Sequence, residues 1–344
     1  MVLITSCARL PTSPPELPLG NTVTVGGKKL WYLSEGKGEP IVIISGGPGA
    51  AHYLYPYLSP LADSYRVIYL DSFGSGNSER AQSRSDYTLS RHVDEIEGFR
   101  QALGLQAVNV FGHSYGSIVA QAYALKYPSS VKRLVLAAPF ISIEALQGAT
   151  DYVLEAVRHQ FPEIWNQIQK LRANGLHETD KELSDVIQQI PEQLLYYANV
   201  NNAGRLNVDF NPDVSFGILG SDPDLVIRGE LKSLDFRPEL KKLRMPMLVI
   251  AGRYDRSDPP LYSLQYKEFA PQAEFVMLER SGHNFFLEEN AAMIRALRGF
   301  LGERRYTRSW TCGCQRANCP SVWMAPITPR PGIGPIVRNP FDRL

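Results

Sequence analysis

Long hydrophobic runs and an excess of charge of one sign are both missing from this sequence. No uninterrupted apolar stretch approaches the ~18–20 residues that span a bilayer. The formal net charge is only +1, so electrostatics gives no reason to expect binding to nucleic acid or to an anionic membrane surface. These absences predict a protein with neither membrane nor nucleic-acid partners.

Cysteine is scarce and confined to the two ends of the chain. The four cysteines are Cys7, Cys312, Cys314 and Cys319, so no disulfide framework braces the long stretch between them. This usage fits a reducing compartment, and we expect a cytoplasmic protein. The C-terminal three lack the fourth ligand and the spacing of a structural zinc site, so no metal is predicted.

The chain is otherwise average in composition and divides into segments of different pattern. Hydrophobic residues make up 44% and charged residues 21% of its 344 positions, as in ordinary globular proteins. Residues 1–21 are expected to form an extended lead-in because residues 8–20 are rich in proline. Residues 304–344 are rich in proline without a periodic apolar face, which predicts a disordered tail.

Short apolar runs alternate with amphipathic segments through the central part of the chain. The runs cover residues 41–44, 66–70, 107–111, 131–136, 246–250 and 274–278. Runs of this length suit strands buried on both faces, and helical periodicity over 90–103 and 117–127 places helices between them. The pattern predicts an α/β fold with a mainly parallel sheet flanked by helices.

The alternation stops between residues 140 and 234. Helical patterns cover 152–171 and 182–197, but no buried strand is evident until residue 245. We interpret 140–234 as a helical cap inserted into a core formed by residues 22–139 and 235–303.

The segment Gly112-His113-Ser114-Tyr115-Gly116 follows an apolar strand and precedes a helix. A G-x-S-x-G motif in this setting forms a strained strand-to-helix turn that exposes the serine, and small residues two positions away let the turn close. The pattern predicts that Ser114 is a nucleophile.

A serine nucleophile requires a base and an acid that orients the base. His283 follows the last predicted strand, and Asp255 follows the strand before it, which gives the chain order serine, acid, histidine. Asp258, three residues on, remains the alternative acid.

Backbone amides should stabilise the oxyanion that such chemistry produces. We expect one from Tyr115, directly after the nucleophile, and one from Gly47 in Gly46-Gly47-Pro48-Gly49, where glycines allow close approach to substrate. Gly46 is also expected to contact substrate. This mechanism implies no metal or organic cofactor.

At these residues the chain resembles the proline iminopeptidase branch of the α/β-hydrolases, over about residues 22–303. Five segments carry the resemblance: Gly46-Gly47-Pro48-Gly49, Asp71-Ser-Phe-Gly-Ser-Gly-Asn-Ser78, the Ser114 motif, Gly252-Arg-Tyr-Asp255 and Ser281-Gly-His283. The resemblance implies an α/β-hydrolase fold with a helical cap, the three catalytic roles given above, and a substrate that is a short peptide or another small molecule.

Members of that family remove an N-terminal residue, often proline, and hold the substrate ammonium with acidic side chains. The resemblance assigns Asp224 to the cap acid. It places Arg256, a cation, where a carboxylate is usual after the triad aspartate. Ser45 replaces the usual histidine before the glycines, and Phe73 replaces a usual arginine.

The sequence therefore predicts a serine hydrolase acting by acyl transfer, similar to proline iminopeptidases, that cleaves an N-terminal residue or a small amide. Arg256 favours the alternative, a carboxylesterase on small or aryl esters. A non-catalytic binding protein of the same fold is less expected because such proteins usually lose a triad member. Haloalkane dehalogenases and epoxide hydrolases carry aspartate at the position of Ser114. The sequence leaves the oligomeric state open.

Overall fold

The computed structural model of the chain describes residues 19–191, 193–206 and 208–302. The four cysteines, the predicted tail and nearly all of the predicted lead-in lie outside these residues. In the part of the chain that the structure describes, no helix combines the length and apolarity needed to cross a membrane.

One eight-stranded sheet forms the centre of the fold, in the order β1-β2-β4-β3-β5-β6-β7-β8. The strands are β1 (Asn21–Val25), β2 (Lys28–Glu35), β3 (Glu39–Ile44), β4 (Tyr65–Leu70), β5 (Val108–His113), β6 (Val131–Ala137), β7 (Met247–Gly252) and β8 (Glu274–Leu278). The pairs β1–β2 and β2–β4 are antiparallel, and all pairs from β4 to β8 are parallel. This arrangement confirms the α/β fold class.

Both faces of the sheet are buried, which explains why its central strands are apolar throughout. Along β3, Val42 and Ile44 belong to one core cluster, whereas Ile41 and Ile43 belong to another. The first cluster includes side chains of α1 (Leu89–Ala102) and α2 (Tyr115–Lys126), and the second includes side chains of α12 (Asn290–Leu301). The helices therefore cover the sheet from two sides.

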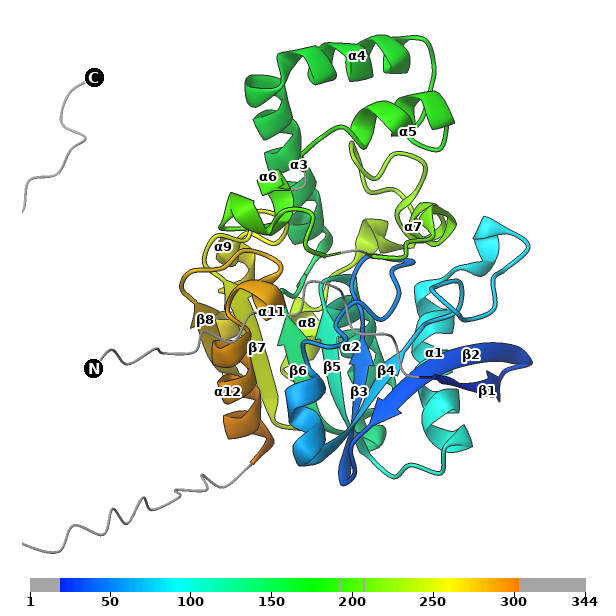
Figure 1. The fold of residues 1–344 in the computed structure, drawn as a ribbon, viewed down its shortest axis with the longest axis vertical. Coiled ribbons are helices and arrows are strands. Elements are labelled where there is room, and N and C mark those ends of the chain that lie inside the picture. The colour runs from blue at the N-terminus through cyan, green and yellow to red at the C-terminus, as the bar shows by residue number, and fades with distance from the viewer. Residues whose placement is uncertain (1–18, 192, 207, 303–344) are drawn as a thin grey trace, which may run out of the picture. The chain divides into compact units, whose positions relative to one another are not determined.

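Further helices lie between β6 and β7 and gather beyond one end of the strands (Figure 1). They are α3 (Ile143–Gln160), α4 (Pro162–Ala173), α5 (Lys181–Ile187), α6 (Gln193–Tyr196) and α7 (Pro212–Leu219). The short α8 (Arg237–Leu240) also precedes β7 but lies level with the strands. The remaining short helices are α9 (Pro260–Ser263), α10 (Tyr266–Phe269) and α11 (Phe285–Glu288). We refer to residues 140–234 as the cap segment.

The single helical pattern expected over 152–171 is wrong in its bounds, because two helices share it. α3 begins at Ile143, and Phe161 leaves the helical conformation at φ −133° before Pro162 begins α4. Proline disfavours the helical conformation of the residue before it but is well suited to the first turn of a new helix. The proline therefore sets the break. Likewise, α5 and α6 divide the pattern expected over 182–197.

Candidate active site

Ser114 occupies the turn between β5 and α2 and has a strained backbone. Its φ is 54° and its ψ is −123°, one of two positive-φ conformations among the described non-glycine residues. Such a conformation costs of order 1–3 kcal/mol and persists only where the surroundings enforce it. The turn places Ser114 at the carboxyl ends of the parallel strands, directly before the first residue of α2.

The two glycines of the motif are required because backbone atoms approach them closely. A Cβ at Gly112 would lie 2.2 Å from the Gly116 carbonyl oxygen, and a Cβ at Gly116 would lie 2.3 Å from the Ile44 carbonyl oxygen. Neither neighbour can move without displacing a strand or the helix. The glycines therefore let α2 pack directly beneath the Ser114 turn.

Replacing Gly116 with alanine should therefore destabilise the protein by at least about 2 kcal/mol, through overpacking against the backbone of β3. Gly299→Ala is the matched control, because a Cβ at this exposed position of α12 meets no atom within 4 Å. There we expect stabilisation of about 0.5–1 kcal/mol from helix propensity. Urea unfolding measures both free energies, and equal effects of the two variants would contradict the packing argument.

His283 and Asp255 meet at the same sheet edge from the loops after β8 and β7. The His283 Nδ1 atom lies 2.8 Å from Asp255 Oδ2, and both side chains are buried. A carboxylate at this distance holds the imidazole with its proton on Nδ1 and leaves Nε2 as the basic atom. The close approach of the two loops depends on Gly252, where a Cβ would lie 2.2 Å from the Gly282 carbonyl oxygen.

Burial disfavours the charged forms of both His283 and Asp255. It lowers the pKa of His283 from its usual 6.5 to about 3 and raises the pKa of Asp255. The backbone amides of Asp258 and Ser257 oppose the rise in the Asp255 pKa by donating hydrogen bonds to the carboxylate, the first at 2.7 Å. The imidazole is therefore neutral at rest, as a base must be.

Asp258, the alternative acid, has a different partner. Its Oδ2 accepts a hydrogen bond from Ser263 Oγ at 2.7 Å, and its side chain is fully buried. Burial and the charge of Asp255 raise the Asp258 pKa well above its usual value. The structure therefore brings Asp255, rather than Asp258, to His283.

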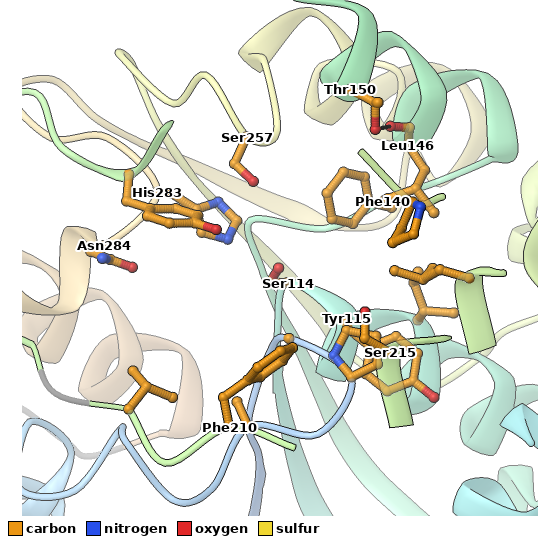
Figure 2. A pocket seen from close by; sticks show the side chains of 18 of the residues that line it. Ser114, Tyr115, Phe140, Leu146, Thr150, Phe210, Ser215, Ser257, His283 and Asn284 are labelled. Atoms are coloured by element: carbon orange, nitrogen blue, oxygen red, sulfur yellow. Dashed lines mark hydrogen bonds between the residues drawn. The ribbon is translucent and has the colours of Figure 1, made fainter. Parts of the chain in front are cut away.

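Ser114 and His283 line the same cavity, and Figure 2 shows the serine oxygen and the imidazole ring facing one space. Among the described residues, no hydrogen bond joins Ser114 Oγ to His283 Nε2. Catalytic hydrogen bonds are often long in ligand-free enzymes and shorten when substrate binds.

The positions expected to form the oxyanion hole lie beside Ser114. Tyr115 is the first residue of α2, so its amide is one of the helix N-terminal donors that have no acceptor within the helix. Gly47 lines the cavity with a φ of 57°, which favours glycine. Gly46 is not among the cavity-lining residues, and its amide donates to the Tyr53 hydroxyl at 2.8 Å.

A hydrogen-bond chain that the sequence did not reveal links three loops of the site. The His113 Nε2 atom lies 3.1 Å from the His283 carbonyl oxygen and must donate to it, so Nδ1 accepts from the Tyr53 hydroxyl at 2.6 Å. Tyr53 in turn accepts from the Gly46 amide. Burial raises the pKa of Tyr53 above its usual value, which keeps its proton in place. The chain thus joins the Gly46-Gly47 loop, the Ser114 turn and the His283 loop.

Glu288, also missed from the sequence, fastens the cap segment to the His283 loop. Its carboxylate accepts from the Gly282 amide at 2.7 Å, and from the amides of Ala198 and Asn199 at 3.1 and 2.9 Å. The Asn284 amide donates to the Tyr196 carbonyl oxygen nearby. No short motif signals such a contact, because its partners lie about 90 residues apart in the chain.

The structure does not bring Asp224 or Arg256 into the cavity. The Asp224 carboxylate accepts from Arg172 Nη2 at 2.5 and 2.6 Å, and Arg256 donates to the Tyr197 carbonyl oxygen at 3.4 Å. Neither side chain is among the residues that line the cavity. The expected acidic contact for a substrate ammonium is therefore occupied by an arginine of the cap segment.

The cavity above Ser114 has a volume of about 580 Å³ and lies between the core and the cap segment. Cap-segment residues Phe140, Leu146, Phe210 and Leu219 line it together with residues of the core. This size is typical of a small-molecule site. In the described ranges, no group of three or more histidine, cysteine or acidic side chains could hold a metal ion.

Comparison with known proteins agrees with this architecture. Residues 39–170 match the family model for the alpha/beta hydrolase fold. The proline iminopeptidase of Heyndrickxia coagulans is 28% identical over 280 residues, which cover 78% of this chain and 93% of that protein. The proline iminopeptidase of Saccharolobus solfataricus is 26% identical over 278 residues, which cover 79% and 87%.

A solved structure shares the fold. The proline iminopeptidase of Mycobacterium smegmatis superimposes with a TM-score of 0.67 at 22% identity, covering 82% of this chain and 97% of that one. The chain therefore has the α/β-hydrolase fold, and over most of its length its sequence is similar to the proline iminopeptidases.

Proposed function

We propose that this protein is a serine hydrolase that acts by acyl transfer, with Ser114 as nucleophile, His283 as base and Asp255 as the acid that orients the base. The observation that carries the proposal is the convergence of a strained serine at a helix N-terminus with a buried histidine–aspartate pair in one cavity. Three loops far apart in the chain supply these groups, and each follows a parallel strand.

The reaction proceeds in two steps, acylation of Ser114 and hydrolysis of the acyl-enzyme. Ser114 Oγ forms a bond to the substrate carbonyl carbon while His283 Nε2 takes the hydroxyl proton, and the amides of Tyr115 and Gly47 stabilise the oxyanion. The bond to the leaving alkoxide or amine then breaks, and the leaving group receives the proton from His283. Water attacks the acyl-enzyme in the same way and regenerates Ser114.

The similarity to proline iminopeptidases supports an N-terminal residue or a small amide as the acyl donor. A second candidate is hydrolysis of small or aryl esters. The engagement of Asp224 by Arg172 favours it, because an ester substrate needs no carboxylate for a free amine.

Labelling with a fluorophosphonate probe tests the proposed chemistry, because only an activated serine reacts. We expect stoichiometric modification that peptide mapping places at Ser114. Ser117, buried one turn along α2, is an internal control that should stay unmodified. A folded protein that takes up no probe would contradict the proposal and favour a non-catalytic binding protein.

A further inference from the structure

The cavity beside Ser114 contains almost no charge. Apart from His283, none of its lining residues in the described part of the chain is acidic or basic. Besides Ser114, its polar side chains are hydroxyls and one amide, on Tyr53, Tyr115, Thr150, Tyr196, Tyr197, Ser215, Ser257 and Asn284. Because burial lowers the pKa of His283, the imidazole adds no positive charge at neutral pH.

Asp222 and Asp224, two acidic side chains of the nearby cap segment, share the cation Arg172 of the same segment. Arg172 contacts Asp222 at 2.7 Å and Asp224 at 2.5 Å, and all three side chains are at most 13% exposed. His177 Nδ1 lies 2.6 Å from the other oxygen of Asp222. The Asp222 pKa is lowered to about 2, so its carboxylate stays ionised and committed to these partners.

An ammonium group that enters such a cavity would lose water and gain no carboxylate in return. Burial of an unpaired charge is among the most unfavourable changes in protein interiors, and the group usually loses its proton instead. An uncharged acyl group meets no such cost and gains from contact with the apolar walls.

We propose that this cavity selects uncharged, largely apolar acyl groups, so that esters or amides without a free amine are the preferred substrates. The inference rests on the proposed function, because it concerns the acyl group that Ser114 receives. It departs from the substrate class that the relatives' names indicate.

A matched pair of substrates tests the selection. The 4-nitroanilides of proline and of cyclopentanecarboxylic acid have the same leaving group and ring size, and differ by an ammonium in place of a methylene. At pH 6, an α-amino group of pKa about 8 is roughly 99% protonated. We expect kcat/KM about a hundredfold higher for the cyclopentane compound, and a gap that narrows as the pH rises through 8.

Introducing a carboxylate into the cavity should reduce the preference for the cyclopentane compound. Ser215 of α7 lines the cavity and points into it in Figure 2. Ser215→Asp should raise kcat/KM for the proline anilide, relative to the cyclopentane compound, by about tenfold or more. Ser215→Asn, nearly the same in size but uncharged, should leave the ratio near that of the original protein.

The outcomes separate the two proposals. Fluorophosphonate labelling at Ser114 together with preference for proline anilide at pH 6 would overturn the substrate class and leave the serine chemistry standing. Absence of labelling would overturn the chemistry. In that case, calorimetric binding of the two anilides still tests the cavity, and tighter binding of the proline compound at pH 6 would reject its selectivity.

Discussion

Replacing Ser114 with alanine is expected to lower kcat by about 10⁴- to 10⁶-fold on whichever ester or amide the protein hydrolyses. The alanine cannot form the acyl-enzyme, and the loss of one triad member removes most of the benefit of the other two. Rates on 4-nitrophenyl butyrate at saturating substrate measure the change. The melting temperature should move little, since the hydroxyl forms no hydrogen bond needed for packing.

Ser114→Gly is the matched control for backbone strain in this experiment. It should be as inactive as Ser114→Ala but more stable by about 1 kcal/mol, because glycine adopts a φ of 54° without the penalty that a Cβ imposes. Turnover by either variant above about 1% of the original rate would refute Ser114 as the nucleophile.

Replacing Asp255 with asparagine is expected to reduce kcat by about 10⁴-fold while the fold is kept. Asparagine is close in size but can present its amide to His283 Nδ1, which moves the imidazole proton to Nε2 and removes the basic lone pair. The 2.8 Å contact between Nδ1 and Asp255 Oδ2 makes this tautomer exchange the dominant effect. A pH–rate profile with matched thermal unfolding measures it.

Asp258→Asn distinguishes the two candidate acids. Asparagine is close to Asp258 in size, and its side-chain oxygen can still accept the hydrogen bond that Ser263 Oγ donates. We expect less than about a tenfold loss in kcat, because the Asp258 side chain contacts Ser263 rather than His283. A larger loss for Asp258→Asn than for Asp255→Asn would reverse the assignment.

The sheet could be predicted from sequence because its strands are buried on both faces. The runs at 41–44 and 246–250 are apolar at every position, as β3 and β7 require, and the observed strands begin and end within a few residues of the predicted bounds. The first and last residues of the cap helices are harder to predict, because these helices bury only one of their faces. A periodic pattern there runs through the break at Phe161 and Pro162.

Some features of the candidate site could likewise be predicted from the sequence, and others could not. The G-x-S-x-G motif and its flanking strand and helix are contiguous, so they could be recognised from residues 108–126 alone. The choice between Asp255 and Asp258 could not be made locally, since three residues of loop allow either carboxyl to turn inward. The placement of Asp224 depends on Arg172, which is 52 residues away in the chain. No local sequence pattern indicates that these two side chains form an ion pair.

By itself the sequence determined the α/β class, the order of the predicted catalytic residues along the chain and the position of the strained serine turn. Each of these depends on short-range backbone rules and on apolar periodicity. Only the tertiary structure decided which acid meets His283, that Tyr53 and His113 link the loops, and that the cavity carries almost no charge. These features arise from side chains that approach one another across long sequence separations, where burial and charge pairing, rather than local propensity, choose the partner.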